Sequence, residues 1–266
     1  MRQDRNFDDL VDRFENKFYA SEKGRLRLQL VQRALVADSH ALKQSRPLRI
    51  LDIGCGLGQM AQWLAAQGHT VVACDLSPAI VERAQVRIAE QDPQLLERIT
   101  FLAAPLQSLD GLISRKFDLV LFHAVLEWLA EPAAALQAAT SWLAPTGELS
   151  LLFYNRDSLV FKNLLRSDFR RVEADDYAGD QGGLTPSYPL EIAAVERWVN
   201  DNGLSIVQRR GIRTFADYLP HSLDRRIPAR VSEAELIDME WKFSTRSPLR
   251  ELARYQLWQC VQRGTG

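Results

Sequence analysis

The feature that most constrains the fold is a regular alternation of apolar and amphipathic segments in the middle of the chain. The apolar runs, each of strand length, lie at 49–54, 70–77, 99–104, 117–125 and 147–155. Segments with helical periodicity separate most of them. Strands that are apolar throughout are typical of a sheet buried on both faces, which requires parallel pairing with helices on each side. The alternation therefore predicts an α/β fold with a doubly wound sheet.

The flanking segments extend this core. Helical periodicity precedes it at 8–19 and 22–44, and a helix at 191–203 is followed by a sixth strand at 204–215 and a last strand at 253–263. We therefore predict a mostly parallel, seven-stranded Rossmann-like sheet with N-terminal helices and helical insertions. We expect one domain over 1–266, divided into N-terminal helices at 1–46, a cofactor-binding core at 47–155, and substrate-side insertions at 156–188 and 216–250.

A glycine-rich turn, LDIGCGLGQ at 51–59, joins the first strand to the next helix. Glycine is needed where the backbone takes a positive φ or approaches a ligand closely. Asp52 is placed to orient this turn or to meet a positively charged ligand group. The dinucleotide fingerprint fails from Gly54 because position 59 is Gln, whereas a pattern shifted to Gly56 fits G-x-G-x-x-A. The turn alone leaves S-adenosylmethionine and a dinucleotide both open.

Three further side chains follow strands at the edge where ligands bind in such sheets. Asp75 ends the second strand, where an acid accepts hydrogen bonds from ribose hydroxyls; the alternative is a cap for the next helix. Gln107 follows the third strand, where adenine is usually contacted. His123 follows the fourth strand; its position favours a ligand contact over a structural role. We assign nearby Trp128 to the core.

Several classes of function are disfavoured. The fourth strand is not followed by the Asn-Pro-Pro-Tyr sequence typical of adenine amino methylation, and no cysteine is placed as a pyrimidine nucleophile. No close cluster of metal-ligating residues is present, so we predict no metal. No apolar run approaches the roughly 20 residues that span a membrane, and the N-terminus does not resemble a signal peptide. The three cysteines are widely spaced, so we expect a cytoplasmic protein with reduced thiols.

Six segments carry a more specific resemblance. They are QDRNFDD at 3–9, KGRLR at 23–27, LFHAVLEWLAEP at 121–132, LSLLFYN at 149–155, SYP at 187–189 and GIRTFADYL at 211–219. Together they resemble the tRNA 5-carboxymethoxyuridine methyltransferase family, a group of class I methyltransferases. Members of this family transfer a methyl group from S-adenosylmethionine to the carboxylate of 5-carboxymethoxyuridine at the tRNA wobble position, which gives a methyl ester.

The resemblance implies a set of cofactor contacts. These contacts are Arg27, Gly54, Cys55, Asp75, Leu106, Gln107 and His123. Together with Asp52 and Gly56 of the glycine-rich turn, they form the predicted cofactor-binding set. The sequence departs from the family pattern at Cys55, where glycine is expected. Because contacts at that position use backbone N–H groups, cysteine is compatible with them.

The chemistry implied by this resemblance needs no general base, because a carboxylate with a pKa of about 4 is already ionised at neutral pH. Charge is lost when an anion meets a sulfonium, so we expect orientation and proximity to dominate. Tyr19, Tyr154 and Asn155 are candidate donors at the acceptor site, and Arg213 is a candidate for recognising the carboxylate. The alternative for each of these four is core packing or surface solvation.

The implied partner is the anticodon loop of a tRNA. Basic residues outnumber acidic ones after Ser205, although the whole chain has a net charge of −1. The candidate phosphate contacts are Arg209, Arg210, Arg213, Arg225, Arg226 and Arg230. Three alternatives remain: a methyltransferase for a small-molecule carboxylic acid, a dinucleotide-dependent reductase, and a non-catalytic cofactor-binding module. The reductase is supported only by the shifted glycine pattern.

Overall fold

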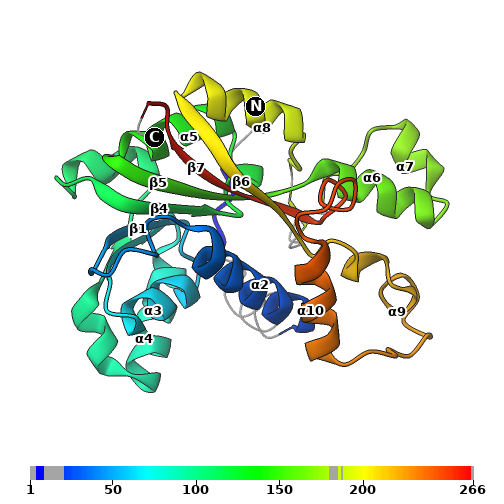
Figure 1. Ribbon diagram of the computed structural model, residues 1–266, viewed down its shortest axis with the longest axis horizontal. Coiled ribbons are helices and arrows are strands. Elements are labelled where there is room, and N and C mark those ends of the chain that lie inside the picture. Colours follow the sequence, from blue (N-terminus) through cyan, green and yellow to red (C-terminus); the bar gives the residue numbers. More distant parts are fainter. Residues whose placement is uncertain (1–3, 9–20, 180–184, 187, 265–266) are drawn as a thin grey trace.

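A single seven-stranded sheet organises the molecule (Figure 1). The computed structural model describes residues 4–8, 21–179, 185–186 and 188–264. The strands are β1 (Arg49–Ile53), β2 (Thr70–Asp75), β3 (Ile99–Ala103), β4 (Phe117–His123), β5 (Leu143–Tyr154), β6 (Leu204–Ile212) and β7 (Tyr255–Gln262). They lie in the order β3-β2-β1-β4-β5-β7-β6. Strands β1 to β5 pair in parallel, and β7 pairs antiparallel with both β5 and β6. The predicted doubly wound, mostly parallel sheet is confirmed.

Helices cover both faces of the sheet, as the apolar strands require. One core layer joins the sheet to α2 (Glu22–Asp38), α3 (Gln59–Ala66) and α4 (Pro78–Gln91). The other joins it to α5 (Pro132–Ser141) and α8 (Ile192–Asp201). The four central strands β2, β1, β4 and β5 supply buried side chains to both layers.

Two element boundaries differ most from the predictions. The helix expected over 22–44 ends at Asp38, because the buried carboxylate of Glu148 accepts hydrogen bonds from Ser39 Oγ and the Ala41 amide and so turns the chain. Strand β5 begins at Leu143, earlier than expected, and a bulge in its pairing with β4 accommodates the extra residues. The helix expected at 8–19 falls almost wholly outside the described residues.

The two predicted insertions lie beyond the carboxyl end of β5 (Figure 1). The first holds α6 (Arg156–Leu165) and α7 (Phe169–Glu173), and the second holds α9 (Pro220–Leu223) and α10 (Glu233–Phe243). Helix α10 packs beside α2. Within the described residues, no helix is both long and apolar enough to cross a membrane.

Candidate active site

The glycine-rich turn is tied to the neighbouring strand by its backbone. The amides of Gly54 and Cys55 both donate to the carbonyl of Cys74, at 2.8 and 3.0 Å. Gly54 has a φ of +67°, and a Cβ at this position would lie 2.3 Å from Cγ2 of Val125. Gly54 is therefore required by both its backbone conformation and the close approach of the loop after β4. The turn is rigid before any ligand arrives.

Asp75, at the end of β2, fixes the other side of the turn. Its Oδ2 accepts from the Gly56 amide and its Oδ1 from the Ser77 amide, both at 3.0 Å. A carboxylate offers about four acceptor positions, so acceptor capacity remains for a ligand. The cap of α4 is Ser77, whose Oγ accepts from the Ile80 amide at 3.1 Å. The alternative interpretation of Asp75 as that cap is therefore wrong.

Asp52 is a buried carboxylate that has unused capacity to accept hydrogen bonds. Its side chain is 3% exposed, and Oδ2 has no hydrogen-bond partner in the described part of the chain. Burial, with a smaller contribution from Asp75, raises the pKa of Asp52 to about 7. A buried acceptor without a partner is costly, so a cationic donor at this point would stabilise the site. The ammonium group of S-adenosylmethionine has the required charge.

Three adjoining hollows surround this turn, and Gly54 lines all of them. Between them, they are lined by the nine predicted cofactor contacts, namely Arg27, Asp52, Gly54, Cys55, Gly56, Asp75, Leu106, Gln107 and His123. The structure thus brings the whole predicted set to one cleft at the carboxyl ends of β1, β2 and β4. We call this the cofactor cleft.

His123 lies in the cofactor cleft as a neutral side chain. Its Nε2 is 2.9 Å from Oγ of Ser150, on β5. Burial, together with the nearby Arg27, lowers the pKa of His123 to about 3. The imidazole therefore stays uncharged at neutral pH and contributes shape and hydrogen bonding rather than charge.

The N-terminal segment 4–8 closes one wall of the cleft, which the sequence did not predict. Phe7 packs edge-on against Trp128 with ring centroids 4.9 Å apart, and both line a hollow. The Arg5 amide donates to the Trp128 carbonyl at 3.1 Å, and Asp8 hydrogen-bonds Ser77. Trp128 is therefore part of the cleft wall, so its assignment to the core alone is wrong. The signal was present in the QDRNFDD segment, which carried the resemblance but no assigned role.

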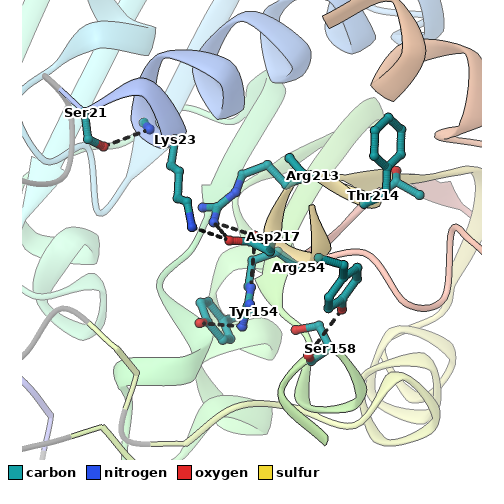
Figure 2. A network of polar contacts seen from close by, with 12 residues as sticks. Ser21, Lys23, Tyr154, Ser158, Arg213, Thr214, Asp217 and Arg254 are labelled. Carbon is teal, nitrogen blue, oxygen red and sulfur yellow. Dashed lines mark hydrogen bonds and ion pairs between the residues drawn. The ribbon is translucent and has the colours of Figure 1, made fainter. Parts of the chain in front are cut away.

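A largely buried ionic cluster gathers around Asp217 (Figure 2). Asp217 is contacted by Lys23 at 2.9 Å, Arg213 at 2.6 Å and Arg254 at 3.3 Å. Nη1 of Arg254 also donates to the hydroxyl of Tyr154 at 3.1 Å. Burial opposes ionisation of Asp217, but the three cations outweigh it and hold the pKa of Asp217 well below its usual value. We call these five residues the Asp217 cluster.

The structure gives a different outcome for each group of predicted acceptor-site residues. Tyr154 and Arg213 meet in the Asp217 cluster, although Arg213 is already paired with a carboxylate. Asn155 is fully buried; its amide donates to the carbonyls of Glu251 and Ala253, and its oxygen caps α6. Both polar groups of its side chain contact backbone, so the structure does not offer Asn155 to a ligand. Tyr19 lies outside the described residues.

Most of the predicted phosphate contacts are engaged in ion pairs. The pairs are Arg209 with Glu196, Arg210 with Asp38, Arg213 with Asp217, and Arg226 with Asp224. Arg225 and Arg230 are exposed. Among the described residues, no group of three or more histidine, cysteine, aspartate or glutamate side chains is arranged to hold a metal.

Comparison with known proteins identifies the family to which the chain is similar. A family model described as a methyltransferase domain matches residues 51–149. The tRNA 5-carboxymethoxyuridine methyltransferase of Escherichia coli K12 is 36% identical over 255 residues, which cover 95% of this chain and 94% of that protein. A ubiquinone biosynthesis O-methyltransferase of Xanthomonas euvesicatoria is 34% identical, but over only 42% of this chain and 46% of its own.

The fold has solved counterparts. The magnesium protoporphyrin IX methyltransferase of Synechocystis PCC 6803, with bound SAH, superposes with a TM-score of 0.61 and 18% identity, covering 96% of each chain. The sheet, the glycine-rich turn and the matched domain define a class I methyltransferase that depends on S-adenosylmethionine. Within that class, this chain belongs to the tRNA 5-carboxymethoxyuridine methyltransferase family. The predicted family, enzyme class and cofactor are confirmed.

Proposed function

We propose that this enzyme methylates the carboxylate of 5-carboxymethoxyuridine at the wobble position of tRNA, giving the methyl ester. The observation that carries the proposal is the similarity to the Escherichia coli tRNA 5-carboxymethoxyuridine methyltransferase, which extends over 95% of this chain. It includes both insertions beyond the sheet and not only the cofactor-binding core. The substrate would be presented by the anticodon loop, and the protein would act in the cytoplasm, where tRNA is found.

The cofactor cleft suits S-adenosylmethionine, which supplies an electrophilic methyl group when bound. Asp75 would accept from the ribose hydroxyls with the acceptor positions that the turn leaves free. Asp52 would meet the ammonium group with its unpaired oxygen. Leu106 and Gln107, on a wall next to Asp75, would contact the adenine.

The acceptor chemistry needs no general base from the cleft. A carboxylate is a nucleophile at neutral pH without losing a proton. His123 is neutral and held by Ser150, so it is not required to remove one. The task left to the protein is to place the acceptor oxygen against the methyl group, which is the contribution of orientation and proximity.

Tyr154 is the best-placed of the predicted acceptor donors. Arg254 donates to the phenol oxygen, so the hydroxyl proton of Tyr154 must point away from Arg254. Burial raises the pKa of Tyr154 to about 12, so the proton is retained at neutral pH. A hydrogen bond from this hydroxyl would orient the substrate carboxylate without the tight ion pair that would stabilise the ground state more than the transition state.

The proposal is tested by incubating the enzyme with radiolabelled S-adenosylmethionine and tRNA that carries 5-carboxymethoxyuridine. The same tRNA with 5-methoxyuridine is the matched control, because it lacks only the carboxylate. We expect label in the first tRNA and none in the second. Label in neither tRNA, with normal cofactor binding, would contradict the proposal and favour a small-molecule acid as acceptor.

A further inference from the structure

A cavity of about 550 Å³ lies outside the cofactor cleft, between α2, α6, α9 and α10. This volume is within the range of about 300–1,000 Å³ that is common for ligand sites. Its walls combine apolar side chains, among them Leu26, Leu223 and Leu236, with charged ones. The helices that form it belong to both predicted insertions and to the segment that carries the KGRLR motif. We call it the cationic cavity.

Positive side chains dominate the charged lining. Lys23, Lys162, Arg166 and Arg225 face the cavity together with Glu22 and Glu233, the only two carboxylates among its lining residues. Glu233 is engaged by Arg25, which is 3.5 Å away. Arg166 is anchored by a hydrogen bond from Nη2 to the Leu223 carbonyl, at 3.1 Å. The lining is therefore electropositive and held in place.

Lys162 is the residue of this lining that most clearly needs an anionic partner. It sits half-buried on α6, and its ammonium group has neither a hydrogen bond nor an ion pair within the described part of the chain. Burial, and then the neighbouring Arg254, lower the pKa of Lys162 to about 8. A cation that is half-buried among other cations is destabilised unless an anion joins it.

The Asp217 cluster (Figure 2) lies close enough to Lys162 to act on it, because its members Arg254 and Lys23 both lower the pKa of Lys162. Lys23, Arg213 and Arg254 share a single carboxylate, Asp217. Nε of Arg213 and Nη2 of Arg254 are buried and have no acceptor among the residues that the structure describes. The cluster is thus incompletely neutralised, and burying unbalanced charge is costly. Lys23 belongs to both the cluster and the cavity wall.

The cationic cavity adjoins the site of chemistry. Lys23 and Arg27 are one turn apart on α2, and Leu26 lines the cavity while Arg27 lines the cofactor cleft. The guanidinium groups of Arg27 and Arg213 both lie against the ring of Tyr255, at 5.4 and 5.8 Å from its centroid. A nucleotide whose reactive end reaches the cleft would therefore have its neighbouring groups beside the cavity.

We propose that the cationic cavity binds an oxyanion of the tRNA substrate and that Lys162 is its principal contact. This inference rests on the proposed function. Two groups of the substrate share the required chemistry, the carboxylate of 5-carboxymethoxyuridine and a backbone phosphate next to it. Most of the cavity wall comes from the two insertions and not from the cofactor-binding core, which supports a role in substrate recognition.

The test compares Lys162→Met with Lys162→Arg and with Lys43→Met. Lys43 is exposed and lies before β1, outside both sites, so its variant removes the same charge elsewhere. Binding is measured for tRNA with 5-carboxymethoxyuridine and for tRNA with 5-methoxyuridine, each at several salt concentrations. Methyl transfer by the unaltered enzyme and the circular dichroism of each variant are recorded first.

We expect Lys162→Met to bind about tenfold more weakly, and Lys162→Arg and Lys43→Met to stay close to the unaltered enzyme. An equal loss for both tRNAs, with the salt dependence reduced by about one counterion, identifies a phosphate. A loss only for the carboxymethoxy tRNA identifies the carboxylate. Unchanged binding of both tRNAs by folded Lys162→Met would overturn the inference. Failure of the unaltered enzyme to methylate tRNA would instead overturn the proposed function.

Discussion

Asp75 helps to build the site, and we propose that it also binds the cofactor. Its two oxygens hold the amides of Gly56 and Ser77, and its remaining acceptor positions face the cofactor cleft. The carboxylate is largely buried, and this burial raises the pKa of Asp75. Hydrogen bonds to a buried charged group are stronger than those between neutral groups.

Asp75→Ala should therefore weaken S-adenosylmethionine binding by about 100-fold, which corresponds to roughly 3 kcal/mol and two charge-assisted hydrogen bonds. Isothermal titration calorimetry measures the dissociation constant directly. Asp92→Ala, which also removes an aspartate that accepts from a backbone amide but outside the cleft, is the control. Equal affinity for Asp75→Ala and the unaltered enzyme would exclude Asp75 as a ribose contact.

Asp52 predicts a pH dependence of cofactor binding. Its pKa is raised to about 7 in the free protein, so it is mostly protonated at lower pH. A bound ammonium group favours the ionised form, so affinity for S-adenosylmethionine should fall as the pH drops below about 7, by up to about tenfold per unit. His123 does not contribute over this range, because its pKa is about 3.

This dependence is measured by titrating the cofactor between pH 5.5 and 7.5 (about the range in which its own ammonium stays charged). Asp52→Asn should bind more weakly at the upper pH and should lose most of the pH dependence. An unaltered slope in Asp52→Asn would show that another group is responsible.

At the scale of elements, a buried carboxylate joins the second insertion to the end of β6. Glu240, on α10, accepts from the backbone amides of Thr214, Phe215 and Ala216, just after β6. Its side chain is fully buried. The turn that it holds leads directly to Asp217, so α10 positions the Asp217 cluster as well as the wall of the cationic cavity.

Glu240→Ala should lower the free energy of unfolding by about 3 kcal/mol, because three buried amides lose their acceptor. Urea denaturation followed by circular dichroism gives this value. Glu90→Ala, an exposed glutamate on α4, should change it by less than about 0.5 kcal/mol. Stabilities within that margin for both variants would contradict the role assigned to Glu240.

For the whole molecule, the parts that depend on local sequence could be predicted. The periods of the strands and helices predicted the sheet. The turn at 51–59, Asp75 and His123 predicted the position of the cofactor cleft, because each lies at or just after the carboxyl end of a strand and the topology brings these ends together. The contacts between distant segments could not be predicted in this way. Lys23 and Asp217 are 194 positions apart, and their pairing depends on how the insertions pack.

Asn155 also shows that local sequence does not decide the role of a polar residue. Its position at the end of β5 suggested an acceptor-site donor, yet the return of the chain at Glu251 and Ala253 uses its amide for structure. Only the tertiary arrangement decides which polar residue at a strand end faces the ligand. The cationic cavity was missed for that reason, since Lys162 and Lys23 come from segments with no common pattern.

The central claim is that the methyl group goes to a carboxylate of tRNA, and nucleoside mass spectrometry tests it most directly. The enzyme is incubated with S-adenosylmethionine and tRNA containing 5-carboxymethoxyuridine, and the digested nucleosides are analysed before and after mild alkali. We predict that the modified nucleoside gains the mass of one methylene group and that alkali restores the parent acid, as expected for an ester. A methyl group that survives alkali, or that appears on another nucleoside, would contradict the account.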